Sequence, residues 1–236
     1  MTRRRALDLG VILLCATPVA WLAWTAAFGD LGANPIETVE HTTGAWALQL
    51  LLATLAVTPL RRLTGWQGMA KQRRTLGLLA FAYATAHFLT WSILDNGLDW
   101  ASIAEDLGKR PFVTVGFAAF VSLIPLALTS SRASIQRLGK RWVALHRLVY
   151  VAAALGVLHF FWLVKKDLRQ PLVYGAVLVA LLGVRLWFRY SKSRSSTVLR
   201  PSARAFSMAR SQSPRTASES GTTTRSEVLK PERPRT

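Results

Sequence analysis

The chain has 236 residues, of which 51% are hydrophobic and 18% charged, and its mean hydropathy is +0.26. These values fit a protein with several membrane-spanning segments better than a soluble domain. The formal net charge of +18 does not indicate nucleic-acid binding, because most basic residues lie in short segments between apolar runs or in the tail, where they set membrane orientation and attract anionic lipid.

The first apolar run, Leu7 to Phe28, is about 20 residues long, which suffices to cross a bilayer as a helix. Pro18 lies inside it, and packed transmembrane helices tolerate proline. A signal peptide also begins with basic residues, but its apolar core is shorter, so we expect an uncleaved anchor. The single cysteine, Cys15, excludes an intramolecular disulfide and a cysteine-ligated metal or iron–sulfur site.

Five further apolar runs follow, separated by segments of alternating charge character. Residues 61–74 and 130–141 are basic without an acidic residue, which predicts a cytoplasmic position, whereas residues 29–43 and 95–110 are acidic on balance. The sequence therefore predicts an all-α, polytopic membrane helical bundle with both termini cytoplasmic. Its six expected transmembrane helices are Leu7–Phe28, Gly44–Leu60, Leu76–Leu94, Phe112–Thr129, Arg141–Lys165 and Pro171–Tyr190.

The composition changes after residue 190, so residues 1–190 are predicted to form one transmembrane domain. Residues 191–236 are basic and rich in Ser, Thr, Arg and Pro, and they cannot bury enough apolar surface to fold alone. We expect a disordered tail that contacts anionic lipid, with binding of a specific partner as the alternative. No internal repeat, glycine-rich phosphate loop or dinucleotide-binding fingerprint is evident in the chain.

Three of the four histidines, His87, His146 and His159, lie within predicted spans. A buried imidazole costs free energy unless its nitrogens find partners, so each is a candidate haem ligand, proton carrier or structural hydrogen-bonding group. At about 1.5 Å per residue, His87 lies roughly 12 Å from Asp95, and His159 roughly 9 Å from Lys165. We expect these two at one level, on helices that run in opposite directions, with a haem clamped between them and an imidazole on each face of the iron.

His146 lies about 8 Å from Arg141, towards the cytoplasmic side, and would serve a second site. Its position, 13 residues (159 minus 146) before His159, corresponds to about 140° around an ideal helix. One straight helix therefore does not direct both imidazoles into the same gap, unless its first turn is irregular.

The helix faces that carry His87 and His159 also carry small residues, which predicts room for a flat cofactor there. These residues are Gly77, Ala80 and Ala84 before His87, and Ala152 and Gly156 before His159.

Other residues of these segments have simpler interpretations. The aromatic run Phe160, Phe161 and Trp162 is expected to face lipid or the interface rather than to conduct electrons. His41, near Glu37 and Glu40, is expected to be a solvated interfacial residue, with proton exchange or partner contact as alternatives.

Five blocks of the chain together resemble a known family: LGANPIETVEHTTGAWAL, VTPLRR, RRTLGLLAFAYATAHFLTW, GKRPFVTVGF and LGKRWVALHRLVYVAAALGVLHFFW. The chain is similar over about residues 7–190 to the haem-binding membrane subunit of the bacterial periplasmic methionine sulfoxide reductase system, the MsrQ or YedZ family. That family belongs to the ferric reductase and NADPH oxidase transmembrane group.

The resemblance implies a b-type cytochrome in the bacterial inner membrane, with His87, His146 and His159 as haem ligands. It would pass electrons from quinol or a cytoplasmic flavin reductase to a periplasmic, molybdenum-containing methionine sulfoxide reductase. FMN is also attributed to the family, but no residue here locates it. An iron with imidazole on both faces suits electron relay, so the sulfoxide chemistry would occur in the partner.

One position departs from the oxidase relatives, which carry a second histidine 14 residues before the outer histidine of the third helix, where this chain has Arg73. A haem at His146 would then lack a second imidazole, and Arg73 or Arg74 would pair with its propionates, unless the site holds something else. One haem is therefore well supported, and a second remains open.

Two other functions fit the sequence less well. A stand-alone transmembrane ferric or quinone reductase would need an NADPH–flavin domain, for which the 46 residues after Tyr190 are too few and too polar. A transporter or scaffold with structural or protonatable histidines would bind no chromophore.

Overall fold

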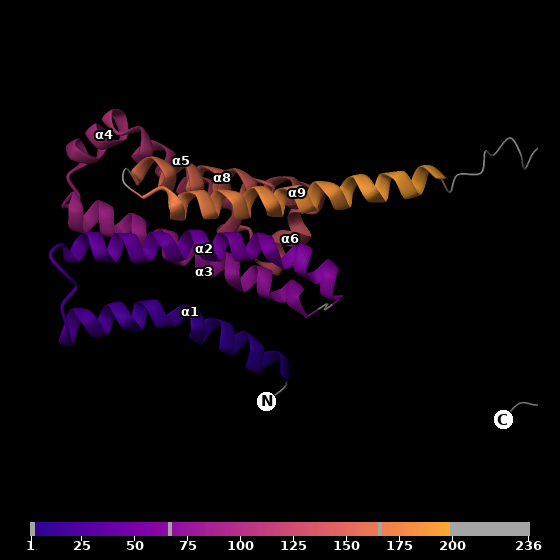
Figure 1. The fold of residues 1–236 in the computed structure, drawn as a ribbon, viewed down its shortest axis with the longest axis horizontal. Helices are drawn as coiled ribbons and strands as arrows, with labels where there is room; N and C mark the ends of the chain where they lie inside the picture. The colour runs from indigo at the N-terminus through magenta and orange to yellow at the C-terminus, as the bar shows by residue number, and fades with distance from the viewer. Residues whose placement is uncertain (1–2, 66–67, 165–166, 199–236) are drawn as a thin grey trace, which may run out of the picture. The chain divides into compact units, whose positions relative to one another are not determined.

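The computed structural model describes residues 3–65, 68–164 and 167–198, and the regular elements in these ranges are all helices (Figure 1). The chain divides into two units, residues 1–189 and 190–236, and the first of them carries the features described below. The elements are α1 (Arg3–Phe28), α2 (Pro35–Thr64), α3 (Met69–Leu89), the π-helix η1 (Thr90–Asp95), α4 (Trp100–Lys109), α5 (Pro111–Leu128), α6 (Arg132–Leu138), α7 (Lys140–Leu145), α8 (Leu148–Leu163) and α9 (Arg169–Val198).

Six helical segments in the described ranges are long and apolar enough to cross a membrane. Large apolar side chains such as Trp24, Leu128, Val179 and Trp187 are exposed along them, as expected for surfaces that face lipid. The predicted all-α membrane bundle with six spans is therefore confirmed, and the chain is a multi-pass membrane protein. The orientation of its termini stays a prediction.

Four helices close a ring at the centre of the first unit. Helix α2 packs along α3 and α5 packs along α8, while α3 also contacts α5 and α2 also contacts α8. Leucines of α2, including the inaccessible Leu55, share one buried cluster with small residues of α8 such as Ala152 and Ala153. We call the end of this ring that carries α4 the α4 end, and the end that carries α6 and α7 the α6 end.

Helix α2 begins nine residues (44 minus 35) before its predicted start at Gly44. The side chain of Asn34 caps the helix by accepting a hydrogen bond from the amide of Glu37, and Pro35 occupies the first turn, where its missing N–H costs nothing. Glu40 and His41, expected in a loop, are consequently helical and project from the same element as the membrane span.

Two segments expected as loops also contain helices. Asp99 caps α4 by accepting hydrogen bonds from Ser102 and Ala101, and these bonds hold the pKa of the Asp99 carboxyl below its usual value. Ser131 caps α6 in the same way through the amide of Ser134. Both helices are short and lie outside the candidate spans, which explains why apolar run length did not reveal them.

The predicted fifth span is not one continuous helix, because α7 ends at Leu145 and α8 begins at Leu148. His146 lies at this break, so the irregular turn foreseen for it is present and the 140° estimate does not apply. Helix α9 continues eight residues (198 minus 190) past the boundary predicted at residue 190. The rest of the predicted tail, residues 199–236, lies outside the described residues.

Arg185 of α9 occupies a gap in the hydrogen bonding of α2. Pro59 has no N–H, so the carbonyl oxygen of Leu55, four residues earlier, cannot receive its usual intrahelical bond. The Arg185 guanidinium donates to this oxygen at 2.6 Å and to the hydroxyl of Tyr150 on α8. Arg185 thereby ties α2, α8 and α9 together.

We expect Arg185→Met to lower the free energy of unfolding by about 1.5–3 kcal/mol, because it removes hydrogen bonds from a charged donor and leaves the Leu55 oxygen unpaired. Pro59→Ala restores the missing N–H, so the cost of Arg185→Met should shrink in the Pro59→Ala background. Thermal unfolding of the wild type, the two single variants and the double variant in detergent measures this coupling, and equal costs in both backgrounds would contradict the assigned role.

A candidate cofactor site between two helical hairpins

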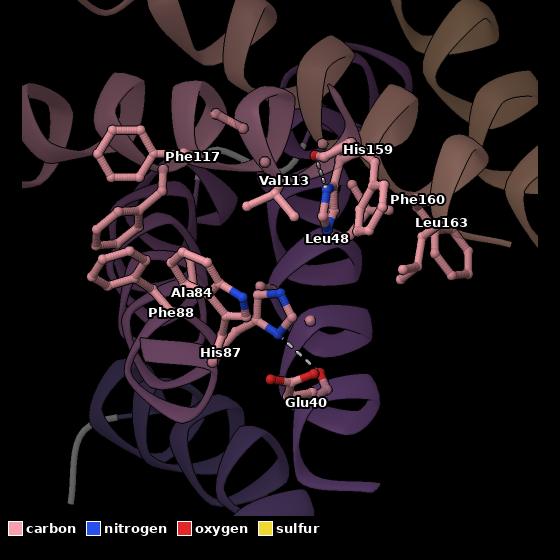
Figure 2. Close-up of a pocket in the computed structure, with 18 of the residues that line it drawn as sticks. Glu40, Leu48, Ala84, His87, Phe88, Val113, Phe117, His159, Phe160 and Leu163 are labelled. Carbon is pink, nitrogen blue, oxygen red and sulfur yellow. Dashed lines mark hydrogen bonds between the residues drawn. The ribbon is translucent and has the colours of Figure 1, made fainter. Parts of the chain in front are cut away.

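A cavity of about 330 Å³ lies inside the four-helix ring, lined by residues of α2, α3, α5 and α8. Its size falls within the range of about 300–1,000 Å³ that small-molecule and cofactor sites occupy. His87 of α3 and His159 of α8 both line it, so the structure brings together the two histidines expected to share one level (Figure 2).

The two imidazole rings are separated by 6.2 Å between centroids, with an angle of 72° between their planes. An iron held by two imidazoles lies about 2 Å from each nitrogen, and a nitrogen lies about 1.1 Å from the centre of its ring, so two ligating rings should stand roughly 6.2–6.3 Å apart. The observed separation thus matches an axial pair on one iron.

Each histidine is held through the same ring nitrogen. Nδ1 of His87 lies 3.0 Å from the carbonyl oxygen of Glu40, and Nδ1 of His159 lies 2.7 Å from that of Phe112. A carbonyl oxygen accepts only, so Nδ1 carries the proton in both rings and Nε2 keeps the lone pair that a metal requires. Figure 2 shows the bond of His87 running to Glu40, on the side away from His159.

Two glycine residues leave the backbone carbonyls of residues 40 and 112 accessible to the histidine side chains. A helical side chain covers the turn before its own Cα, so residues 44 and 116 would shield the carbonyls of residues 40 and 112. Both positions are glycine. A Cβ at Gly44 would lie 3.1 Å from the His87 ring, and one at Gly116 would lie 2.6 Å from Nδ1 of His159, which is closer than Cβ contacts occur.

These correspondences form an internal repeat, so the expectation that the chain has none was wrong. The pairs Glu40 and Phe112, Gly44 and Gly116, and His87 and His159 are each 72 residues apart (159 minus 87). The same offset also matches identical residues around the glycines and the histidines: Thr42 with Thr114, Ala47 with Ala119, Leu51 with Leu123, Leu76 with Leu148, Ala80 with Ala152, Ala82 with Ala154, and Phe88 with Phe160. The α2–α3 hairpin and the α5–α8 hairpin therefore each contribute one histidine by the same local structure.

The expected direction of the histidine helices was wrong. His87 and His159 lie near the C-terminal ends of α3 and α8, and both ends point to the α4 end of the ring, so the two helices run parallel. The physical reason is that exactly one further span, α5, intervenes between them, which restores the direction of the chain. Their common level does not depend on this direction.

The remaining lining separates into a polar mouth and an apolar wall. Glu40, His41, Asp95 and Arg110 line the cavity from segments next to α4. His41 also lies 3.7 Å from Glu37 and remains half exposed, as expected for an interfacial histidine.

The apolar wall includes aromatic rings of α3 and α5, and the Phe88 and Phe120 rings stack at 4.8 Å between centroids. Phe160 lines the cavity and packs on Tyr174, so the expectation that it faces lipid was wrong, whereas Phe161 and Trp162 are exposed.

Some of the predicted small residues do give the cavity its room. Ala84, Ala152 and Gly156 line it. Gly77 instead packs α3 on α2, because a Cβ there would meet Thr54 at 3.7 Å. Gly44 and Gly116 were missed, although the 72-residue offset in the sequence carries the signal that identifies them.

The predicted inner residues lie away from this cavity and do not line it. The His146 ring stacks on Trp142 at 3.9 Å between centroids, and its Nδ1 lies 3.2 Å from the Trp142 carbonyl oxygen. Arg73 is half-buried and Arg74 exposed, at the opposite end of α3 from His87. The roles predicted for these three residues stay predictions.

Comparison with known proteins agrees with this arrangement. The family described as ferric reductase like transmembrane component matches residues 43–157. Proteins named "Protein-methionine-sulfoxide reductase heme-binding subunit MsrQ" are similar over most of their length: that of Ralstonia nicotianae is 50% identical over 82% of this chain and 91% of its own. The Bordetella pertussis protein is 51% identical over 73% and 85%, and that of Rhodospirillum rubrum 49% over 78% and 89%. No solved structure matches the chain. Since relatives of this identity are covered almost completely, the chain belongs to the MsrQ family of membrane proteins.

Proposed function

We propose that this chain is the haem-binding membrane subunit of a protein-methionine-sulfoxide reductase system and relays electrons across the bacterial inner membrane. The observation that carries the proposal is the 6.2 Å separation of the His87 and His159 rings, together with the bonds that hold both Nδ1 atoms on backbone carbonyls. The names of its relatives support the same haem-binding role.

A haem b in this cavity would supply one-electron transfer without opening a coordination position to substrate. The residues present fit such a group. His87 and His159 would hold its iron through Nε2, and each carbonyl bond fixes the orientation and tautomer of its imidazole. The aromatic and small residues of the wall exclude water from the cavity. Arg110 supplies a positive charge to the lining of the polar mouth.

The names of the relatives, which describe a subunit of a methionine sulfoxide reductase, support a separate partner. A haem iron held by both histidines would offer no position to a sulfoxide, so we propose that sulfoxide reduction occurs in a catalytic subunit that is periplasmic and contains molybdopterin. The cavity lies towards the α4 end, which the charge pattern predicts to be periplasmic. Electrons would enter at the α6 end, from quinol or from a cytoplasmic flavin reductase, and we propose FMN as a further cofactor of this chain, as the family resemblance implies.

Purification in mild detergent from haem-replete cells tests the proposal. We expect a reduced-minus-oxidised spectrum with the sharp bands of a six-coordinate, low-spin b-type haem, at least one haem per chain, and no carbon monoxide adduct, because both axial positions are filled. A colourless preparation would contradict haem binding. A five-coordinate spectrum that changes with carbon monoxide would contradict the paired imidazoles.

A second candidate, a transmembrane ferric reductase, is favoured by the family match over residues 43–157. The two functions differ in their electron acceptor. Stopped-flow oxidation of the reduced protein by ferric citrate, compared with oxidation by the purified methionine sulfoxide reductase catalytic subunit, separates them. We expect saturable oxidation by the catalytic subunit only.

A further inference from the structure

A group of cationic side chains at the α6 end has no role in the histidine cavity. Arg185 uses two guanidinium nitrogens on Tyr150 and Leu55, and its third nitrogen, Nε, is buried with no hydrogen-bond partner. A buried N–H donor without a partner costs about 1–3 kcal/mol, so its presence suggests a ligand group that accepts there.

Arg73 brings a second positive charge to the same place. It lies two residues inside the candidate span 71–95, is half-buried, and interacts electrostatically with Arg185, Arg61, Tyr150 and His146. Its interactions with Arg185 and Arg61 are repulsive, and the partial burial of Arg73 reduces the screening of this repulsion by water.

Among the side chains that the structure describes, no carboxylate pairs with Arg73 or Arg185. Residues 41–94, 107–166 and 168–198 contain no Asp or Glu, and the acidic residues that line the cavity belong to the α4 end. Cations inside a membrane protein are paired or mark a binding site, so these two arginines are suited to an anionic ligand. Tyr150 accepts a hydrogen bond from Arg185, which leaves its own hydroxyl proton to donate to the same ligand.

We propose that Arg73, Arg185 and the Tyr150 hydroxyl form a binding site for a phosphate group at the α6 end of the bundle. Guanidinium groups match phosphate oxygens through paired hydrogen bonds, and basic pockets between transmembrane helices bind phospholipid head groups. Arg73 is only about 3 Å inside the span, a depth that both a lipid phosphate and a soluble phosphate ester can reach. The site is separate from the histidine cavity, whose lining includes none of the three residues.

The test measures the thermal midpoint of the full-length protein by tryptophan fluorescence, since a ligand that binds the native state raises it. In one arm, protein in dodecyl maltoside micelles, whose head groups carry no phosphate, receives inorganic phosphate, with chloride at equal ionic strength as reference. In the other arm, the same micelles contain phosphatidylglycerol or no added lipid. The variants are Arg73→Gln and, as control, Lys71→Gln, which removes one charge from an exposed residue on the same helix.

We expect a rise in the midpoint for the wild type and for Lys71→Gln, and none for Arg73→Gln. A rise in the first arm identifies a soluble phosphate, and a rise in the second alone identifies a lipid head group. Without either ligand, Arg73→Gln should be more stable than the wild type, because it relieves the repulsion from Arg185 and Arg61. No rise in either arm, an equal rise in Arg73→Gln, a destabilised unliganded Arg73→Gln, or a fall in its haem-to-protein ratio would overturn the phosphate site.

Discussion

We expect His87→Ala and His159→Ala each to remove most of the bound haem, and His146→Ala to leave most of it, when the three variants are purified in parallel. Each of the first two changes takes away one of the paired imidazoles in the cavity, and the remaining ring can hold the iron on one face only. His146 lies outside this cavity, where its ring stacks on Trp142. Haem-to-protein ratios, from pyridine haemochrome absorbance and amino-acid analysis, measure the effect.

His41→Ala is the matched control, because His41 also lines the cavity but lies at its polar mouth, beside Glu37. We expect it to retain its haem. Equal losses for His87→Ala, His159→Ala and His146→Ala would contradict the assignment of one axial pair. Full retention in His87→Ala or His159→Ala would contradict the site altogether.

Gly116→Ala should have the next largest effect, a fall in haem affinity of at least about tenfold, which is typical when the support of a metal ligand is disturbed. The added Cβ would lie 2.6 Å from Nδ1 of His159, so the ring must move and lose its bond to Phe112. At Gly44 the corresponding distance to the His87 ring is 3.1 Å, so Gly44→Ala should cause a smaller loss. Haem titration of the apoprotein measures the affinity of each variant. The width of the low-spin electron paramagnetic resonance signal shows whether the histidine rings have moved.

Gly183→Ala in α9 controls for the replacement of a helical glycine by alanine, because a Cβ there meets nothing within 4 Å. Alanine favours a helix over glycine by about 1 kcal/mol, so this variant should be at least as stable as the wild type and bind haem normally. Loss of haem in Gly183→Ala, or unchanged affinity in Gly116→Ala, would show that the glycines do not act through the histidines.

The repeat gives these two predictions a common basis. One local structure, a glycine that exposes the carbonyl four residues before it, orients both imidazoles from equivalent helical hairpins. The hairpins differ beyond the histidines, since η1 continues α3 to Asp95 as a π-helix, whereas α8 ends at Leu163. Short π-helical segments within α-helices are frequent at functional sites, and Trp91 and Asp95 of η1 both line the cavity.

The sequence by itself determined the membrane class, the six spans and the common depth of His87 and His159, because run length, charge alternation and rise per residue are local properties of the chain. Only the tertiary structure decided which carbonyls hold the imidazoles and that Phe160 faces the cavity, whereas the parallel direction of the two histidine helices already follows from the order of the spans. It also showed that Arg185 donates to the Leu55 oxygen left unpaired by Pro59, although Arg185 and Leu55 are 130 positions apart. These features arise where side chains of different helices meet, and the period of a single helix carries no information about its neighbours.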